Sequence, residues 1–473
     1  MTTPDAAHSL PADTDAADTG PADTDSAPRG WSDPRGIDFM AAADVFTKLD
    51  LELKPDPSRT VIRPFSFAYP EAFDDGRPSR AQAVVDRVRA TDPALRTRMR
   101  ALLTAPMRER HRNADQVFLR RFAEVRDELG AGEFDEDEQF LIGAYFSQEY
   151  AFESAALFNP SMVRLPDDAL EGQPSEPGAV RFLLSLRGIG EGHISSVTFR
   201  TGEWGPGDRL VLDPPSANGV PPQIDRTEAD WVRLRCEDSR DVSETVIFPV
   251  LPSQRQGVED LRLVTFTDHD GVQSVIGTYT AFDGKDARQE LLRGVDMRTY
   301  EMRPLTGDMA GYKGMALFPR RIDGQFVMLG RQDSENIWLL RSDDLYTWER
   351  AEAQPLMAPK YPWEFVQLGN CGSPLEIDEG WLVFTHGVGM VRGYCIGACL
   401  LDKQDPSKVL ARTPSPLLFP SAEQRGGYVP NVTYSCGGLL HDRRILLPYA
   451  IGDEFSAFAV GSVDDLLSVM VPA

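Results

Sequence analysis

The chain of 473 residues has few cysteines, a shortage of positive charge and no long apolar stretch. Its five cysteines form no C-x-x-C spacing, which argues against a zinc site and favours a reduced protein without structural disulfides. No apolar run reaches the roughly 20 residues that span a bilayer. The N-terminus also lacks a basic stretch followed by an apolar core, so we expect no signal peptide and a cytoplasmic location.

Basic residues are strongly outnumbered. Lys and Arg together number 49 against 73 Asp and Glu, so the formal net charge is -24 at pH 7. Such a surface repels phosphate backbones and anionic lipid headgroups, which argues against nucleic-acid and membrane-surface partners. A Walker-type loop, a glycine-rich dinucleotide fingerprint and a spaced cluster of histidines and carboxylates are all missing from the sequence. We therefore expect neither a cofactor nor a bound metal.

The composition divides the first third of the chain into two regions. Residues 1–35 are mainly Ala, Asp, Thr, Pro and Ser, and bury too little apolar surface to offset their ordering entropy, which predicts a disordered acidic tail. Residues 36–154 are expected to form an extended arm followed by helices from Ser79 to about Ser154, because apolar residues there recur at three- and four-residue steps. This helical part is expected to be an accessory region that packs on the main domain or forms a subunit contact.

After Leu157 the helical spacing stops, and one plan of short strands and turns occurs five times. Each copy has a strand or hairpin that ends in a polar motif, then a turn, then an outer strand. The clearest copy contains the dipeptide Asp323-Gly324, which is a strong signal for a hairpin turn. Four tryptophans of these copies are expected in the core: Trp338, Trp348, Trp363 and Trp381.

Five small antiparallel sheets predict a mainly β fold, a five-bladed β-propeller over residues 155–473. The copies span roughly 45 to 60 residues each, and a Pro- and Asp-rich stretch at about 202–244 is expected to be an irregular insertion. In a propeller, one strand of every blade lies at the central axis. The polar motifs at these strands are therefore expected to converge.

An acidic pair, Glu259-Asp260, stands between Gly257 and Arg262, directly before a strand-like run. Its simplest interpretation is a structural ion pair with Arg262. The predicted convergence offers a second interpretation, in which the pair faces a cavity at the axis. Equivalent positions of the copies hold Asn159, Arg187, Glu259, Asp260, Lys313, Arg331, His386, Tyr428 and Asp453.

This set combines carboxylates that can exchange protons with Lys, Arg and His side chains that can hold an anion. A carboxylate beside an anion site suits glycosidic bond chemistry, in which an acid protonates the leaving oxygen while a nucleophile attacks the anomeric carbon from the opposite face.

Structural interpretations remain for each residue. Arg331 could pair with Asp333, Lys313 could be a surface lysine, and His386 could be a satisfied core histidine. His193 is interpreted as serving strand pairing or the substrate edge.

The ordered combination of motifs resembles glycoside hydrolase family 130, which contains the inverting β-mannoside phosphorylases. Residues 257–262 resemble the family signature Glu-Asp-Pro-Arg, with Leu261 in place of the proline. The other matching segments are 156–161, 313–319, 330–333, 369–374, 385–388 and 427–432. The resemblance covers roughly residues 155–470, and residues 38–154 resemble the N-terminal extension of longer members.

The resemblance implies a role for each matching residue. Asp260 matches the general acid, which in this family is thought to act through a sugar hydroxyl. The matching phosphate contacts are Lys313, Arg331, His386 and Tyr394. Residues expected at the sugar are Asn159, Arg187, Glu259, Tyr428 and Asp453. Gly314 departs from the pattern, because shorter phosphorylases often place a polar phosphate contact there.

We therefore expect an enzyme that cleaves a β-mannoside oligosaccharide with inorganic phosphate as co-substrate, releasing α-mannose 1-phosphate without a cofactor. The family also contains hydrolases that lack the basic cluster, so a β-mannosidase on the same scaffold is the alternative enzyme. A non-catalytic carbohydrate-binding propeller is the alternative from another class. The sequence leaves the linkage, the acceptor and a homo-oligomeric state open.

Overall fold

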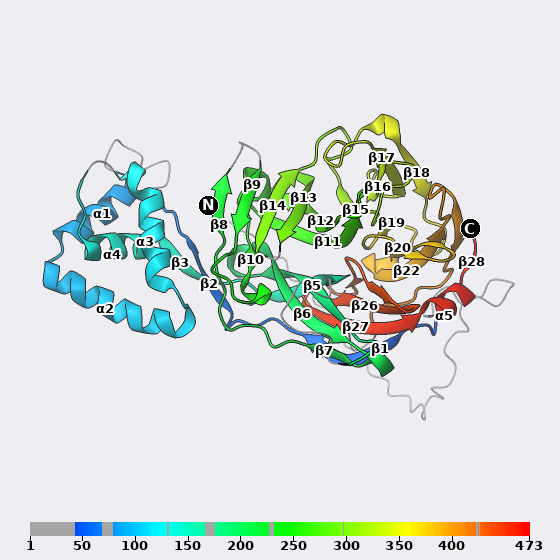
Figure 1. Ribbon diagram of the computed structural model, residues 1–473, viewed down its shortest axis with the longest axis horizontal. Coiled ribbons are helices and arrows are strands. Elements are labelled where there is room, and N and C mark those ends of the chain that lie inside the picture. The colour runs from blue at the N-terminus through cyan, green and yellow to red at the C-terminus, as the bar shows by residue number, and fades with distance from the viewer. Residues whose placement is uncertain are drawn as a thin grey trace, which may run out of the picture.

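The computed structural model of the chain describes residues 43–68, 79–129, 132–165, 176–226, 231–296, 298–421, 424 and 426–473. The tail expected over residues 1–35 lies outside the described residues. Strands dominate the described part, and four helices form a group at one end of the molecule (Figure 1). The mainly β fold predicted from the sequence is confirmed. No helix within these ranges is long and apolar enough to cross a membrane.

The helical group packs around a phenylalanine-rich core. Its helices are α1 (Arg80–Ala90), α2 (Pro93–Arg110), α3 (Ala114–Val125) and α4 (Glu136–Tyr145). A capping box starts α4, since Asp135 accepts the backbone N–H of Glu138 while the Glu138 side chain accepts that of Asp135. Phe118 and Phe140 meet edge to face, with ring centroids 5.3 Å apart. Gly143 permits this close crossing, because a Cβ there would overlap the carbonyl oxygen of Phe118.

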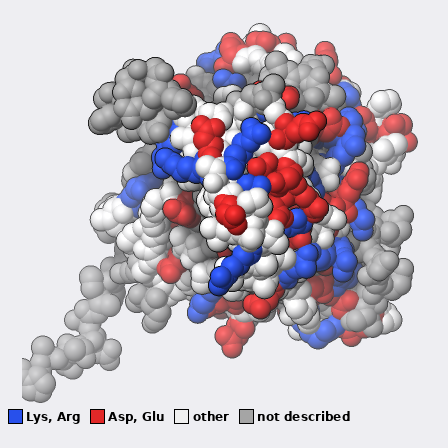
Figure 2. Space-filling model, turned by 90° about the vertical axis from the view of Figure 1, so that its left-hand side faces the viewer, with Lys and Arg blue, Asp and Glu red and all other residues white. Residues whose placement is uncertain are grey.

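Charges of both signs lie close together on the exposed end of this helical group (Figure 2). Arg100 pairs with Asp137 at 3.0 Å and Arg108 pairs with Asp115 at 2.6 Å. Exposed pairs of this kind contribute little to stability. They do neutralise the arginine-rich helix α2 locally, so the surface alternates in sign.

A two-stranded sheet joins the helices to the strand body. It pairs β2 (Thr60–Pro64) with β3 (Ser147–Ala151), so the prediction of helix up to about Ser154 is wrong for β3. Local periodicity misses this strand because its partner lies far away in the sequence. The fully buried Glu153 binds Arg59 at 2.9 Å and Arg200 at 2.7 Å, which ties the arm to the strand body.

The strand body consists of successive antiparallel units. The first contains β4 (Ala156–Arg164), β5 (Val180–Ile189) and β6 (Ser195–Trp204), with β7 (Leu210–Leu212) and β10 (Val246–Ile247) on β6. The second contains β11 (Gly257–Thr267), β12 (Gln273–Phe282), β13 (Ala287–Asp296) and β14 (Thr299–Pro304), extended by β9 (Val232–Arg235) and β8 (Gln223–Arg226). A parallel pair, Gly257 with Ser195, joins the two units into one sheet.

Three further sheets follow along the chain. One contains β15 (Lys313–Leu317), β16 (Phe326–Arg331), β17 (Ile337–Ser342) and β18 (Ala353–Met357). The next contains β19 (Gln367–Asn370), β20 (Leu375–Ile377), β21 (Gly380–Val388), β22 (Tyr394–Leu401), β23 (Val409–Arg412) and β28 (Val471–Pro472). The last contains β24 (Thr433–Tyr434), β25 (Leu439–His441), β26 (Arg444–Ile451), β27 (Phe455–Ser462) and β1 (Thr47–Leu53), and the short helix α5 (Val463–Ser468) follows β27.

The stretch at about 202–244, expected to be an irregular insertion, contains short strands within its described residues. Strand β6 runs on to Trp204, and β7, β8 and β9 lie inside the stretch. The β8–β9 hairpin adds to the edge of the second unit, where Leu234 pairs with Tyr300. Strands of three or four residues in a Pro- and Asp-rich context give no periodic signal of their own.

The turn and core predictions are confirmed. Asp323 and Gly324 both have positive φ, and Ile322 and Gln325 exchange backbone hydrogen bonds of 3.0 and 3.1 Å across them. A glycine relieves the strain that this hairpin geometry places on its second position. The four tryptophans expected in the core are all buried.

Candidate functional site

Most of the predicted polar residues lie on the first strands of the units or on the strands beside them. These leading strands are β4, β11, β15, β19 and β24, and they carry Asn159, Asp260 and Lys313. The neighbouring strands add Arg187 from β5, Arg331 from β16 and His386 from β21. Strand pairing sets part of the arrangement, since Lys313 stands opposite Arg331.

Arg187 holds both members of the acidic pair. Its Nη2 donates to Glu259 Oε1 at 2.8 Å and its Nη1 donates to Asp260 Oδ1 at 3.1 Å. Its Nε donates to Ser195 Oγ at 2.8 Å, which fixes the guanidinium plane. Glu259 Oε2 also accepts from Lys313 Nζ at 3.2 Å. The four side chains therefore form one charged network, and Lys313 belongs to it rather than being an isolated surface lysine.

Two bulges aim the central side chains. The pairing of β4 with β5 shifts between Phe158 and Ser161, around Asn159, and the pairing of β11 with β12 shifts around Asp260. Asn159 and Asp260 both have positive φ, of 48° and 55°. Asn159 Nδ2 donates to Asp260 Oδ1 at 2.6 Å. Such backbone conformations cost free energy and cluster at functional sites, where bulges redirect side chains.

Asp260 is held in its ionised form. Burial alone would raise its pKa, but the charges of Arg187 and Arg262, with the hydrogen bond from Asn159, outweigh burial and lower the pKa to about 2. Asp260 is therefore a carboxylate at neutral pH. It can donate a proton only after something else changes the local charge.

Arg262 does not form the ion pair that the simplest interpretation of the sequence suggested. Its Nη1 donates to the backbone carbonyl of Asp260 at 3.0 Å, not to a carboxylate oxygen. Its Nε donates to the Cys371 carbonyl at 2.9 Å and its Nη2 to Tyr434 Oη at 2.7 Å. Arg262 thus links its own strand β11 to β24 and to the residue that follows β19. Tyr434, which the sequence analysis missed, is part of this link.

Leu261, which replaces the proline of the family signature, is almost fully buried. It packs over Gly277 of the neighbouring strand, where a Cβ would overlap the Leu261 side chain. Core packing therefore holds the backbone beside Asp260 in place of a proline ring.

A second group is basic. Arg331 Nη1 lies 3.1 Å from His386 Nε2, and Gln367, with its amide oxygen turned towards Arg331, accepts from Nε at 3.2 Å. The suggested pairing with Asp333 is wrong, because that carboxylate accepts from Asn336 and from the backbone of Glu335. Within the described ranges Arg331 has no acidic partner. A half-buried guanidinium with neutral neighbours favours the binding of an anion.

His386 is buried and stays neutral. Burial, followed by the charges of Arg331 and Arg262, lowers its pKa well below the ordinary value. Its ring stacks on Tyr394 at a centroid distance of 6.0 Å and meets Tyr434 edge to face at 4.9 Å. Its Nδ1 is buried without a hydrogen-bond partner in the described structure. The neutral ring can donate to or accept from a ligand oxygen.

Asp453 differs from Asp260 in its ionisation. It lies in the tight turn between β26 and β27 with a φ of 51°. Burial and the negative charge of Asp260 raise its pKa to about 6, against the opposing charges of Arg187 and Arg392. Two carboxylates of one site therefore have pKa values displaced in opposite directions.

We expect Asp453→Asn to stabilise the protein at pH 8. The raised pKa means that ionisation of Asp453 weakens the folded state: the penalty is absent below about pH 4, grows up to about pH 6 and is complete above it. It amounts to about 3 kcal/mol, and asparagine tolerates the positive φ. The thermal unfolding midpoint should rise at pH 8 and match the wild type at pH 4. An equal change at both pH values would contradict this explanation.

The mouth of the site carries Tyr428 and His193. Tyr428 is exposed, and its ring lies 5.7 Å from that of His193. No hydrogen bond joins Tyr428 to the acidic network among the described residues, so it stands at the periphery. Strand pairing does not explain His193, because its φ is positive and it lies outside the strands.

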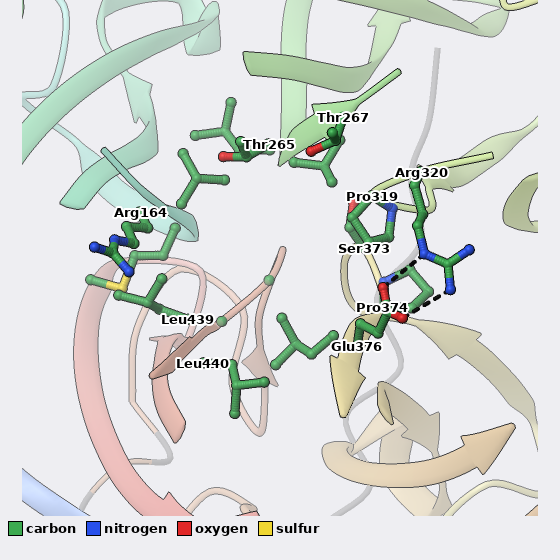
Figure 3. A pocket seen from close by; sticks show the side chains of 17 residues that line it. Arg164, Thr265, Thr267, Pro319, Arg320, Ser373, Pro374, Glu376, Leu439 and Leu440 are labelled. Carbon is green, nitrogen blue, oxygen red and sulfur yellow. Dashed lines mark hydrogen bonds and ion pairs between the residues drawn. The ribbon is translucent and has the colours of Figure 1, made fainter. Parts of the chain in front are cut away.

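A cavity of about 410 Å³ lies further along the same leading strands, beyond Arg262 (Figure 3). Leu263 and Thr265 of β11 line it, together with Leu439 of β25, and Arg320 pairs with Glu376 at one side. None of the predicted site residues borders it. The cavity and the acidic network thus occupy opposite ends of one set of strands.

The chain is similar to several known proteins. The model of glycoside hydrolase family 130, described as β-1,4-mannooligosaccharide phosphorylase, matches residues 237–471. A 1,2-β-oligomannan phosphorylase of Thermoanaerobacter sp. (strain X514) is 33% identical over 227 residues, 46% of this chain and 74% of that protein. A β-1,4-mannooligosaccharide phosphorylase of Ruminococcus albus is 35% identical over 165 residues, 32% of this chain and 48% of that protein.

A solved β-1,2-mannobiose phosphorylase from Listeria innocua, in complex with β-1,2-mannobiose, matches 67% of this chain and 92% of its own, with 19% identity and a TM-score of 0.48. The family assignment does not depend on that likeness. It depends on the 33% identity over 74% of the Thermoanaerobacter protein and on the matched residues 237–471, which contain Asp260, Lys313, Arg331 and His386. The chain therefore belongs to glycoside hydrolase family 130.

Proposed function

We propose that the protein is a glycoside phosphorylase that cleaves a β-mannoside with inorganic phosphate and releases α-mannose 1-phosphate. One observation carries the proposal: Lys313, which binds Glu259 of the acidic network, stands opposite Arg331, a guanidinium without an acidic partner in the described structure. A hydrolase needs no anion site, because its nucleophile is water. The relatives named as mannoside phosphorylases support the choice of sugar.

Phosphate binds at the basic group in this proposal. Arg331 offers N–H donors to the phosphate oxygens and Lys313 adds a positive charge. His386 and Tyr394, whose rings stack, supply further hydrogen bonds. Gly314 places no side chain at the mouth of this group, and its positive φ of 86° accommodates the backbone there.

The mannosyl unit is proposed to bind at the acidic network. Asn159, Arg187 and Glu259 present hydrogen-bonding groups around Asp260, and Asp453 faces them from the last sheet. Tyr428 lies at the mouth, where it can contact the outer part of the sugar. Asn159 Oδ1 is buried without a partner in the described structure, so a sugar hydroxyl would satisfy it.

The reaction inverts the configuration at the anomeric carbon. A phosphate oxygen forms a bond to the anomeric carbon while the bond between that carbon and the leaving oxygen breaks. The electron pair of the broken bond goes to the leaving oxygen. That oxygen takes a proton from Asp260 through a mannosyl hydroxyl. The proton that hydrogen phosphate loses returns to Asp260, so no other reactant is consumed. Bound phosphate also adds negative charge near Asp260, which raises its pKa from about 2 towards the range of a general acid.

The fold that we propose for this site is a five-bladed propeller spanning residues 155–473, with residues 36–154 as an arm and helical accessory region. Five antiparallel units support it, since their leading strands border the acidic network at one end and the 410 Å³ cavity at the other. The cytoplasmic location, the homo-oligomeric state and the lack of a cofactor remain predictions.

The test is an incubation with β-1,4- and β-1,2-linked mannobiose, each with and without phosphate, followed by phosphorus NMR. We expect α-mannose 1-phosphate to appear only when phosphate is present. Equal release of mannose with and without phosphate would identify a β-mannosidase instead. Binding without turnover, unchanged by Asp260→Asn, would leave a carbohydrate-binding propeller.

A further inference from the structure

The strand that carries Lys313 bulges directly after that residue. Lys313 of β15 stands opposite Arg331 of β16, and the pairing shifts before it resumes at Ala316. Gly314 and Met315 form this bulge, and Gly314 has a positive φ of 86°, which glycine adopts without strain. A bulge leaves backbone groups without partners in the ladder. Both residues are buried, so these groups need partners from elsewhere in the protein.

Three side chains from neighbouring sheets supply the partners. Met315 N–H donates to Gln289 Oε1 at 3.1 Å, and Thr278 Oγ1 donates to the Met315 carbonyl. Asn370 Nδ2 donates to the Gly314 carbonyl at 2.9 Å. Thr278 lies on β12 and Gln289 on β13, in the unit before β15, whereas Asn370 lies on β19, in the sheet after it. The bulge is therefore held from both sides.

All three side chains are buried, with no more than 1% of each exposed. Gln289 Nε2 donates to Thr280 Oγ1 at 2.8 Å, which fixes the orientation of the amide. Asn370 Oδ1 has no partner among the described residues, so the bond to the bulge is the one that its side chain makes there. Burying polar groups costs free energy unless they are hydrogen-bonded. The partner that the three side chains share is the bulge.

The strand of Asn370 also packs against the basic group. Gly369, the residue before Asn370, stands opposite His386 on β21. A Cβ at Gly369 would overlap the His386 ring and would lie 3.2 Å from Arg331 Cδ. Asn370 therefore connects the strand of Lys313 to the strand that is in close contact with Arg331 and His386.

The register of the bulge decides where Lys313 points. Successive side chains of a strand point to opposite faces, so a shift of one residue would turn Lys313 away from the acidic network. In the observed register Lys313 Nζ lies 3.2 Å from Glu259 Oε2 and 5.6 Å from the centre of the Phe282 ring. Gly314 has no side chain to offer to an anion. The placement of Lys313 therefore matters for any anion bound beside Arg331.

We propose that three buried residues position Lys313 for phosphate: Thr278, Gln289 and Asn370. They touch neither phosphate nor sugar, and act through the backbone of the bulge. This inference rests on the proposed function, in which Lys313 and Arg331 bind one phosphate. A purely structural role is the alternative, in which the three hydrogen bonds stabilise the fold and leave Lys313 unaffected.

Two substitutions of Thr278 separate the hydrogen bond from packing. Thr278→Val removes the hydroxyl and keeps the shape, so the Met315 carbonyl loses this partner. With the mannobiose that the wild type cleaves, the KM for phosphate should rise about fivefold, while the KM for mannobiose should change by less than about twofold. Thr278→Ser keeps the hydroxyl and should retain the wild-type KM for phosphate. A serine variant as defective as the valine variant would contradict the inference.

Asn370→Leu tests the bulge from the other side, because it removes the bond to the Gly314 carbonyl and keeps the volume of the side chain. It should raise the KM for phosphate by a similar factor, so the inference can be tested even if Thr278→Val does not fold. A wild-type KM for phosphate in both Thr278→Val and Asn370→Leu would overturn the inference.

The matched control is Thr413→Val. The buried Thr413 hydroxyl also bonds backbone, since it accepts from Ala398 N–H at 3.0 Å and donates to the Ala398 carbonyl at 3.3 Å. Within the described ranges it has no hydrogen bond to Lys313 or Arg331. Thr413→Val should lower the thermal midpoint and leave the KM for phosphate unchanged. A rise in this KM equal to that of Thr278→Val would assign the effect to a general loss of stability and overturn the inference.

Failure of the proposed function would be distinct from failure of this inference. If the wild type does not cleave mannobiose with phosphate, the proposed function fails, but the placement of Lys313 can still be measured by acetylation with acetic anhydride and mass spectrometry. The bond to Glu259 protects the Lys313 ammonium group. Lys313 should react about fivefold faster in Thr278→Val than in the wild type, and at the wild-type rate in Thr278→Ser. Equal rates in all three proteins would contradict the inference.

Discussion

Asp260→Asn is expected to lower the rate of mannose 1-phosphate release about 1,000-fold or more, because it removes the proton donor and keeps the shape of the side chain. Asparagine tolerates the φ of 55° at this position, so the bulge should persist. Stability should fall at the same time. A pKa lowered to about 2 means that the ionised carboxylate strengthens the folded state, a contribution present above about pH 4 and lost as the pH falls through 2.

The measurement is the initial rate of product release at saturating phosphate, with the thermal midpoint at pH 7. Asp268→Asn is a matched control, because that carboxylate also has a pKa lowered to about 2, by hydrogen bonds to His269 and by Arg321, but lies away from the acidic network. Its rate should equal that of the wild type. Full activity of Asp260→Asn would assign proton donation to another group.

Arg331→Met should reduce kcat/KM for phosphate about 100-fold, because two charge-assisted hydrogen bonds to the anion are lost. The protein should not be destabilised. Arg331 has neutral neighbours, His386 and Gln367, and within the described part of the chain no acidic group loses a partner when it is removed. Loss of function without loss of stability is the outcome that separates a ligand-binding cation from a structural one.

Rates at increasing phosphate concentration check this prediction. Arg320→Met is the control, since Arg320 is paired with Glu376 beside the distal cavity and is remote from His386. Its phosphate dependence should match the wild type. A phosphate curve of Arg331→Met that superimposes on that of the wild type would exclude Arg331 from the phosphate site.

Local patterns in the sequence were enough for much of the fold. The Asp323-Gly324 turn was predictable because only a few residues adopt its positive φ values with little strain. Strand β3 was not, because its stability comes from pairing with β2, far away in the sequence. Strands β7, β8 and β9 are short and depend on the edges that they join.

At the site, too, local sequence patterns were enough for some residues, whereas others depend on contacts between distant parts of the chain. Asp260, Lys313, Arg331 and His386 could be chosen because their residue types and motif order resemble a known family. The role of Tyr434 could not, since it depends on a hydrogen bond to Arg262 between distant strands. The opposite displacement of the Asp260 and Asp453 pKa values depends on burial and on through-space charges, which no motif encodes.

Strand β1 completes the last sheet by pairing antiparallel with β27, so that Thr47 stands opposite Val460. Ribosomes make β1 first and β27 almost last, so β1 has no partner while most of the chain is being synthesised. Contacts that join such distant residues form slowly. Until they form, β27 is an open edge that can pair with another chain. The most vulnerable period for aggregation should therefore come late, after the residues of the acidic network have already been made.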